Sequence, residues 1–466
     1  MEEGKLKREI TVLHGVLLLV GTVIGASAFI LIGPLAAKTG PALWLAYALA
    51  AVPAVFVAIV FAQLGTAFPM TGATYITVSR LLSPAVSLVM AWSVLLGICL
   101  FVLPLMGLGV GIYVKAMLPP LGSSIMAELF VPLVALISLA FFTWLNVIGI
   151  KWMMWFQSIA TGLAILVLLV FGLGGAFFTN PSYQVPMFPL GLGALAAAII
   201  PAYIMYTGVN AMTELGGETK NPRRSIPLIL LISMILLVII YISITYSLTG
   251  LLPWQECKVD AAVAVAAGKF LPETFARYFI SIGAILAAVT TILGGYAFLS
   301  RDVMALGKDL VLPGAFGKVS KRYGTPANSI ILLGVTSVVG LFLALAYVMI
   351  TKSDSLIVEL ATSASLAFML MSVLGCLSMF LLRKKMPERY EAATFKLKGF
   401  WLPFFTIGGA VLFIGLMIVG FVTSPIAGTA IVVLVITGVI YYYLRNWQLR
   451  RQGIRLEDRL SKVEEI

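Results

Sequence analysis

Long apolar runs recur along nearly the whole chain, and they limit the folds that it can adopt. Twelve such segments can be counted, at 11–37, 41–68, 84–114, 126–148, 152–178, 190–213, 226–250, 270–301, 325–350, 356–382, 400–422 and 425–445. A helix of about 20 apolar residues is long enough to cross the ~30 Å hydrocarbon core of a bilayer. Since 61% of the residues are hydrophobic and only 11% are charged, we predict an all-α integral membrane protein with twelve transmembrane helices.

The formal net charge of +12 is explained by membrane topology rather than by nucleic-acid binding. If the N-terminus is cytoplasmic and the spans alternate in direction, 25 of the 31 Lys and Arg residues fall on the cytoplasmic side. Basic residues accumulate in the cytoplasmic loops of membrane proteins. We therefore expect a multi-pass protein of the cell membrane, with both termini in the cytoplasm and the lipid bilayer around it.

Residues that carry chemistry are sparse. His14 is the only histidine, and Cys99, Cys257 and Cys376 are widely spaced, so neither a metal site nor a disulfide framework is indicated. An enzyme inside the membrane needs paired carboxylates, a histidine cluster or a nucleophile with its base. No close acidic pair occurs within a span, and we do not expect an enzyme.

Two spans contain small residues where a continuous helix is expected. The first holds the stretch Gly21–Gly33, and the sixth holds Pro201 followed by Thr207 and Gly208. Glycine inside a helix costs roughly 0.5–1 kcal/mol relative to alanine, although small residues also serve close helix packing. The two spans occupy corresponding places in two five-span halves. That correspondence favours two broken helices that bind a small polar solute in mid-membrane.

A polar stretch follows the second span, at residues 69–84. It is too polar to cross the membrane and too short to form a domain. Tyr75, Val78 and Arg80 suit a short helix that lies along the membrane surface.

Five motifs occur in order along the chain: Gly21-x-x-Ile24-Gly25-x-x-x-Phe29, Pro69-x-x-Gly72-Ala73-x-Tyr75, Asn146-x-x-Gly149-x-Lys151, Glu218-x-Lys220-Asn221-Pro222-Arg223-Arg224-x-Ile226-Pro227, and Ser300-Arg301-x-x-x-Ala305-x-x-Lys308-Asp309-x-x-Leu312-Pro313 followed by Thr325-Pro326. Together they resemble the amino acid–polyamine–organocation transporter superfamily over residues 5 to 445. The resemblance implies a leucine-transporter-type fold. Its parts would be a cytoplasmic N-terminus (1–10), two inverted five-helix repeats (11–178 and 190–382), two further helices (400–445) and a cytoplasmic tail (446–466).

The resemblance also implies a substrate site between spans 1, 3, 6, 8 and 10. In the first span, the carboxylate of an amino acid would meet Ala26, Ser27 and Ala28, and Ile24 and Gly25 would offer carbonyls. Half-helix N-termini attract anions and freed carbonyls attract cations. A zwitterion therefore matches a site of two broken helices without a charged side chain.

In the sixth span, the corresponding residues are Tyr206, Thr207 and Gly208, with Ile204 near the side-chain pocket. Asn210 stands where relatives often have an acidic residue. A cationic side chain would require a carboxylate inside the membrane, so we predict a small neutral amino acid as the substrate. An amino acid exchanger, a polyamine or organic amine permease and a transporter-like nutrient sensor are the alternatives. The sequence does not indicate the oligomeric state.

No cofactor is expected, apart from a coupling ion that is either sodium or a proton. Some proton-coupled relatives carry a lysine in the fifth span, at a position that matches Ala164 here. Sodium-coupled relatives use adjacent hydroxyl residues on span eight, which suggests a sodium site from Thr290, Thr291 and the carbonyls of Gly21 and Ile24. The alternative is that both hydroxyls bond back to their own helix.

Four charged residues fall at the cytoplasmic ends of spans six to eight: Glu214, Glu218, Arg223 and Arg301. We predict that they form ion pairs that hold an inward gate, because charge pairs at such a mouth can favour one access state. The alternative is that they anchor the topology.

Overall fold

The computed structural model describes residues 10–70, 73–119, 125–149, 153–353, 355–454 and 456. Within these ranges the chain is helical, and its only β pairing is an isolated parallel bridge between Ile10 and Thr219. The same ranges contain 11 helical runs that are long and apolar enough to cross a membrane. The chain is therefore a multi-pass membrane protein. The described residues leave out parts of the chain for which predictions were made. These are most of the N-terminus (1–10), the end of the tail (446–466), Gly72 and Lys151.

The long runs follow the apolar segments. They are α4 (Leu43–Ala67); α6 (Pro84–Gly97), η1 (Ile98–Val102) and α7 (Leu103–Met117); α8 (Ile125–Ile148); α9 (Met153–Leu169) and η2 (Val170–Gly174); α10 (Gly191–Tyr203), η4 (Ile204–Tyr206) and α11 (Ala211–Glu214); α12 (Pro222–Leu251); α14 (Glu273–Lys308); α15 (Ala327–Thr351); α16 (Leu356–Lys385); α18 (Trp401–Pro403), η6 (Phe404–Gly408) and α19 (Gly409–Thr423); and α20 (Pro425–Arg451). The first apolar segment is divided into α1 (Val12–Ile24), α2 (Ser27–Ile30) and α3 (Ile32–Thr39). Short helices between the spans are α5 (Ala73–Leu81), η3 (Pro181–Gln184), η5 (Trp254–Cys257), α13 (Ala262–Ala267) and α17 (Pro387–Ala392).

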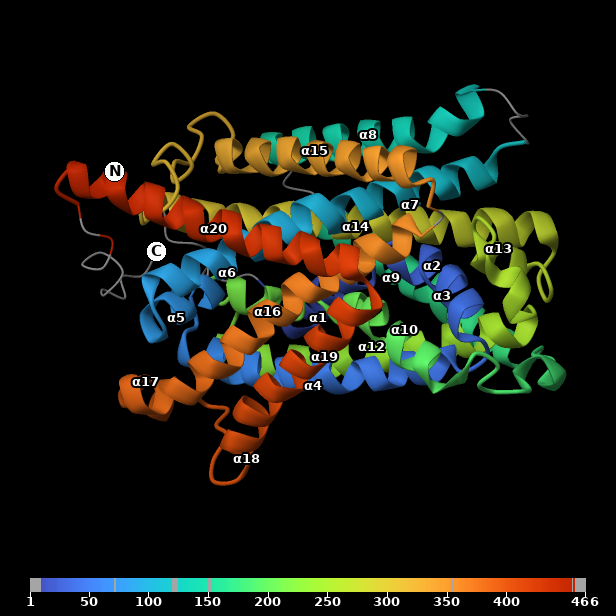
Figure 1. The fold of residues 1–466 in the computed structure, drawn as a ribbon, viewed down its shortest axis with the longest axis horizontal. Helices are drawn as coiled ribbons and strands as arrows, with labels where there is room; N and C mark the ends of the chain where they lie inside the picture. Colours follow the sequence, from blue (N-terminus) through green and yellow to red (C-terminus); the bar gives the residue numbers. More distant parts are fainter. Residues whose placement is uncertain are drawn as a thin grey trace.

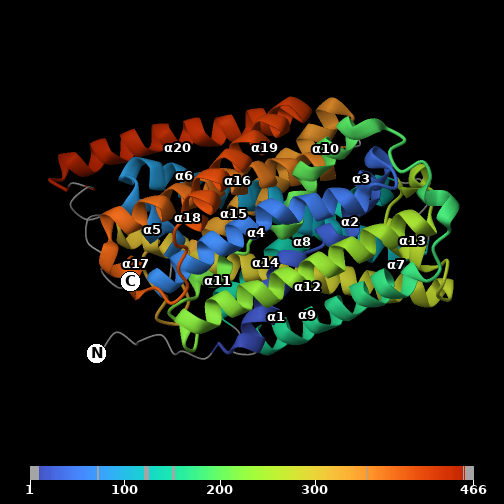
Figure 2. The same cartoon turned by 90° about the horizontal axis from the view of Figure 1, so that it is seen from below.

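Most long helices run along one axis of the molecule (Figure 1). The short helices α5 and α17 lie at one end of this bundle, and α3 and α13 lie at the other, in both views (Figures 1 and 2). We call the first end the basic end, because the ion pairs of Arg80 and Arg301 lie there.

The bundle carries apolar side chains on its outside as well as in its core. On α12, the exposed residues Leu228, Leu231, Ile235 and Ile239 recur every three or four positions and so share one face. The other side of α12 packs against α4, where Tyr241 contacts Tyr47 with 6.3 Å between ring centroids. An apolar outer face of this kind is suited to lipid tails, in agreement with the predicted membrane protein.

The helix predicted to lie along the membrane surface is α5, at the basic end of the bundle. Every residue of α5 except Arg80 is buried. Tyr75 Oη donates a hydrogen bond to Asp309 Oδ2 at 2.9 Å, and Arg80 Nη1 lies 3.3 Å from the same oxygen. Tyr75 and Arg80 thus connect α5 to the end of α14.

Candidate substrate cavity

Helical structure in the first apolar segment stops at Ile24 and resumes at Ser27. Between them, Gly25 has φ +55° and ψ 180°, a conformation found essentially only in glycine. A Cβ at Gly25 would lie 2.8 Å from Met106 Sδ and 3.1 Å from Thr291 Oγ1. The N–H of Ala26 donates to the same Met106 sulfur at 3.1 Å. The interruption therefore needs glycine for its conformation and for its space.

Threonine hydroxyls on α14 satisfy carbonyls near the end of α1. Thr290 Oγ1 donates to Gly21 O at 3.0 Å and to Ala287 O of its own helix at 2.9 Å. Thr291 Oγ1 donates to Gly21 O at 3.2 Å and to Thr22 O at 3.0 Å. The carbonyl of Ile24 has a different partner, the hydroxyl of Ser27 at 3.2 Å. Of the four candidate sodium ligands, Gly21, Thr290 and Thr291 thus converge, and Ile24 does not join them.

Helix α9 completes this region with two buried polar residues. Thr161 faces Gly21: a Cβ built on Gly21 would lie 2.0 Å from Thr161 Oγ1. Gln157 Nε2 donates to Thr290 O at 3.0 Å. Thr161 Oγ1 and Gln157 Oε1 are enclosed and have no hydrogen-bond partner within the described ranges. Two unused oxygens therefore lie beside the threonine hydroxyls and the α1 carbonyls.

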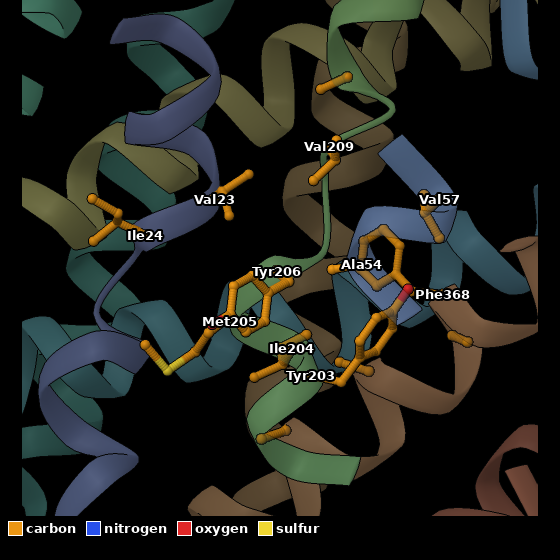
Figure 3. Packing of buried hydrophobic residues seen from close by; sticks show 14 of the residues in the cluster. Val23, Ile24, Ala54, Val57, Tyr203, Ile204, Met205, Tyr206, Val209 and Phe368 are labelled. Carbon is orange, nitrogen blue, oxygen red and sulfur yellow. The ribbon is translucent and has the colours of Figure 1, made fainter. Parts of the chain in front are cut away.

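The sixth span is interrupted over a longer stretch. Helix α10 ends at Tyr203, a 3-10 turn follows to Tyr206, and α11 begins only at Ala211. Within the gap, Thr207 is extended and Gly208 has φ +91°. Thr207 donates to Ile204 O twice, from its N–H at 3.1 Å and from its Oγ1 at 2.7 Å. Figure 3 shows this non-helical segment, with Val209 on it, across from Val23 of α1.

A cavity of about 80 Å³ lies between the two interruptions. A space of this size accommodates several water molecules. Six of the residues predicted to bind substrate line it, namely Gly25, Ser27, Ile204, Thr207, Gly208 and Asn210. Ile24, Ala26, Ala28 and Tyr206 are buried and are not part of its lining. Tyr206 is instead turned toward α4, where its Oη donates to Tyr47 O at 3.1 Å.

Two carboxyl groups also line the cavity, which differs from the predicted site without charged side chains. Glu214, the last residue of α11, is 2% exposed, and its two carboxyl oxygens accept from the N–H of Thr74 at 3.2 and 3.4 Å. Asp302 lies on α14. The two residues belong to different spans, and no single segment of sequence therefore displays them as an acidic pair.

Comparison with known proteins identifies the family. The amino acid permease family matches residues 10–442. The chain belongs to this family. The resemblance predicted from the five motifs is thereby confirmed.

Curated relatives of this permease are named as transporters and permeases. The chain is 27% identical to a branched-chain amino acid permease of Bacillus subtilis (strain 168), over 95% of this chain and 94% of that protein. It is 25% identical to a methylthioribose transporter of the same organism, over 82% of this chain and 83% of that protein. It is also 25% identical to cationic amino acid transporter 3, mitochondrial, of Arabidopsis thaliana, over 72% of this chain and 57% of that protein. These names are consistent with a protein that is not an enzyme.

Much of the cavity wall of the permease is apolar, and we did not predict these residues. They come from the α6–η1–α7 run, α14 and α16, and include Val94, Ile98, Val102, Leu103, Met106, Phe298, Leu299 and Phe368. Ile98 and Val102 belong to the π-helical turn η1, a distortion that often marks functional sites. The sequence signal for this distortion was Pro104, the second residue after the turn. Proline has no backbone N–H to donate to the preceding turn of a regular helix. The sequence cannot show which face of the distorted helix meets the cavity.

The four predicted gate residues of the permease do not form one cluster. Arg301 Nε lies 2.9 Å from Glu218 Oε1, and Arg301 Nη1 donates to Ala297 O at 2.6 Å. Glu214 contacts Thr74 instead of an arginine, as described above. Arg223 is exposed and takes part in no ion pair among the described residues, although its carbonyl accepts a hydrogen bond from Thr394 Oγ1. Of the four predicted gate residues, Glu218 and Arg301 therefore pair with each other, at the basic end of α14.

Proposed function

We propose that this permease is a secondary active transporter that moves a small neutral amino acid across the cell membrane by alternating access. The cavity between the two helix interruptions carries the proposal. The first N–H groups of α2 have no partner within the helix, and a helix N-terminus favours a carboxylate. The carbonyls freed at the interruptions favour an ammonium group. The two ends of a zwitterion are complementary to these two kinds of backbone group.

The apolar part of the wall supports a substrate with an apolar side chain. Met106, Phe298 and Phe368 border the cavity together with Ile98 and Val102. Burial of apolar surface contributes about 25 cal/mol per Å², so such a wall favours aliphatic side chains. The name of the Bacillus branched-chain amino acid permease points in the same direction.

For the architecture, we propose twelve spans in a leucine-transporter-type fold, with inverted repeats at 11–178 and 190–382 and both termini in the cytoplasm. The division of the first apolar segment into α1, α2 and α3 supports a twelfth span beside the 11 runs. The interrupted segments α1–α3 and α10–α11 would then each open one repeat.

For the coupling ion, the candidate sodium site consists of Gly21 O, Thr290 and Thr291. Oxygen ligands suit hard cations, and the unused oxygens of Thr161 and Gln157 support a cation here. Uptake into proteoliposomes, with sodium replaced by choline, tests the site. Unchanged uptake without sodium would eliminate it.

A second candidate substrate is a cationic amino acid or an organic amine. Glu214 and Asp302 favour it, because they provide carboxylates at the cavity, and cationic amino acid transporters are among the named relatives. A substrate of this kind would place its second amino group against the carboxyl pair.

A thermal-shift screen of the twenty amino acids on the purified protein distinguishes these candidates. A ligand at a hundred times its Kd adds about 2.7 kcal/mol to the free energy of unfolding. We expect shifts with valine, leucine, isoleucine or alanine. Shifts with lysine and arginine alone would replace the proposal by the second candidate.

Flux measurements separate transport from sensing. Labelled amino acid that binds but never accumulates in proteoliposomes would indicate a nutrient sensor. Accumulation only when the vesicles are preloaded with amino acid would indicate an exchanger.

A further inference from the structure

We propose that Glu214 and Asp302 together bind one proton, which the permease takes up and releases at the basic end of the cavity. The proton would be coupled to transport, and this second part rests on the proposed function. A proton here does not require or exclude sodium at the Gly21–Thr290–Thr291 site, which lies on another part of α14.

The geometry of the two carboxyl groups carries the proposal. Glu214 is almost fully buried, and its two oxygens share a single backbone donor, the N–H of Thr74. Asp302 Oδ1 is enclosed and has no hydrogen-bond donor among the described residues. Both carboxyl groups border the same small cavity of about 30 Å³. Two ionised carboxylates in one enclosed site repel each other, so a single proton bound by the pair removes one of the two unfavourable charges.

The surrounding charges form ion pairs with other residues, although Arg301 also acts electrostatically on Asp302. On α14, Arg301 is next to Asp302 in sequence, but its guanidinium pairs with Glu218 at 2.9 Å. From α5, Tyr75 Oη donates to Asp309 at 2.9 Å, and Arg80 lies 3.3 Å from the same carboxylate. Helices α6 and α16 contribute only apolar side chains to the small cavity beside the pair, namely Met90, Ala91, Val94, Leu95 and Met371. None of the described ion pairs therefore gives Glu214 or Asp302 a cationic partner.

The space beside the pair suits a proton better than an ammonium group. The small cavity measures about 30 Å³ and is bordered by Thr74, Tyr75, Asn210 and the two carboxyls. This is room for about two water molecules, and for no lysine or polyamine side chain. Waters in this cavity can deliver a proton from the basic end.

The position of the pair links the proton to the substrate site. Glu214, Asp302 and Asn210 border both the small cavity and the larger one between the helix interruptions. When the proton leaves, two like charges remain at one small cavity, and their repulsion favours separation of α11 from α14. Separation at this place would open the basic end, while protonation would favour the closed arrangement.

Infrared spectroscopy of the purified full-length protein during a pH titration tests the proton site without any substrate. We expect a C=O stretching band of a protonated carboxyl group that is lost or displaced in both Glu214→Gln and Asp302→Asn. Glu391→Gln is the control, because the hydrogen bond from Lys396 lowers the pKa of the exposed Glu391 carboxyl, so Glu391 stays ionised over the titration. A wild-type protein without the band, or variants that leave it unchanged, would overturn the proposal.

Transport of L-valine into proteoliposomes tests the coupling. With one proton per amino acid, an inward proton gradient of one pH unit drives about tenfold accumulation. We expect Glu214→Gln and Asp302→Asn to lose this accumulation, while Glu391→Gln keeps it. Glu214→Asp, which retains a carboxyl group, is expected to keep part of the accumulation and guards against loss through misfolding.

Two other outcomes are informative. If lysine or arginine is the transported amino acid and Glu214→Gln removes its binding, the pair is a site for a cationic side chain and the proton proposal is wrong. If the wild-type protein transports no amino acid, the proposed function fails, whereas the infrared titration still decides the proton site.

Discussion

The two helix interruptions face the same cavity but are held in different ways. In the first apolar segment, the break is confined to Gly25 and Ala26, both buried, and α14 and α7 contact it directly through Thr291 and Met106. In the sixth span, the break extends from Thr207 to Asn210, and most of these residues are only half-buried. A Cβ at Gly208 would meet one atom within 4 Å, Val23 Cγ2 at 3.6 Å. The first interruption is therefore a packed anchor, and the second has room to rearrange.

This difference suggests a division of roles. The carbonyls near the first break are bound by neutral threonine hydroxyls, which do not change charge. The second break leads directly into α11 and its carboxyl group, Glu214. We expect substitutions at the first break to affect stability and transport together. Substitutions at the second should affect mainly transport.

The largest effect is expected for Gly25→Ala. The conformation of Gly25 costs other residues about 1–3 kcal/mol, and overpacking against Met106 and Thr291 adds about 1–3 kcal/mol. Unfolding in detergent should show a large loss of stability, and counterflow of the identified substrate should fall more than tenfold. Wild-type stability in this variant would show that the first break is not a packed anchor.

Gly208→Ala is expected to be milder. Its φ of +91° also disfavours alanine, by about 1–3 kcal/mol, but the added methyl group meets only an ordinary contact with Val23. We expect less loss of stability than for Gly25→Ala, and a two- to tenfold reduction of counterflow. Equal destabilisation of the two variants would remove the distinction between the breaks.

Thr291→Val and Thr290→Val measure how strongly α14 holds the first break. Both acceptors of Thr291 are carbonyls of α1, whereas Thr290 also bonds to Ala287 of its own helix. A hydrogen bond contributes about 0.5–1.5 kcal/mol, so Thr291→Val should destabilise the protein more than Thr290→Val. The reverse order in thermal unfolding would show that the contact of Thr291 with α1 is unimportant.

Arg301→Gln is expected to have the smallest effect on stability, because it removes a partly exposed ion pair. The side chains of Arg301 and Glu218 are 27% and 20% exposed, and such pairs contribute about 0–1 kcal/mol. If the Glu218–Arg301 ion pair keeps the basic end closed, Arg301→Gln should nevertheless make the cavity more accessible. A cysteine introduced by Asn210→Cys should then react faster with a thiol reagent added at the basic end. The control is Lys396→Gln, which breaks a pair with the 69% exposed Glu391. Equal labelling in both variants would leave Arg301 with an anchoring role only.

Several features of the site could be predicted because they depend on neighbouring residues. Gly25, Thr207 and Gly208 stand out locally as small or polar residues within apolar runs, and all three line the cavity. Thr290 and Thr291 could also be predicted as a pair, because they are adjacent in the sequence of span eight. Their hydroxyls do reach carbonyls of α1, at Gly21 and Thr22.

Other features could not be predicted, because they depend on how helices are rotated against one another. The contact of Thr161 on α9 with Gly21 on α1 is one example. The contacts of Tyr75 and Arg80 of α5 with Asp309, at the end of α14, also arise only in the folded bundle. The carboxyl pair was missed because Asp302 and Glu214 meet only after α11 and α14 pack together.

The sequence by itself determined that the chain is a membrane-spanning helical permease. Apolar runs, the distribution of basic residues and short motifs can all be recognised in the linear sequence, without knowledge of how the helices pack. It also indicated where two of the helices contain residues unfavourable to a continuous helix. Only the tertiary structure decided which side chains meet across the cavity. A contact between helices depends on their crossing and rotation, which arise from packing of the whole bundle.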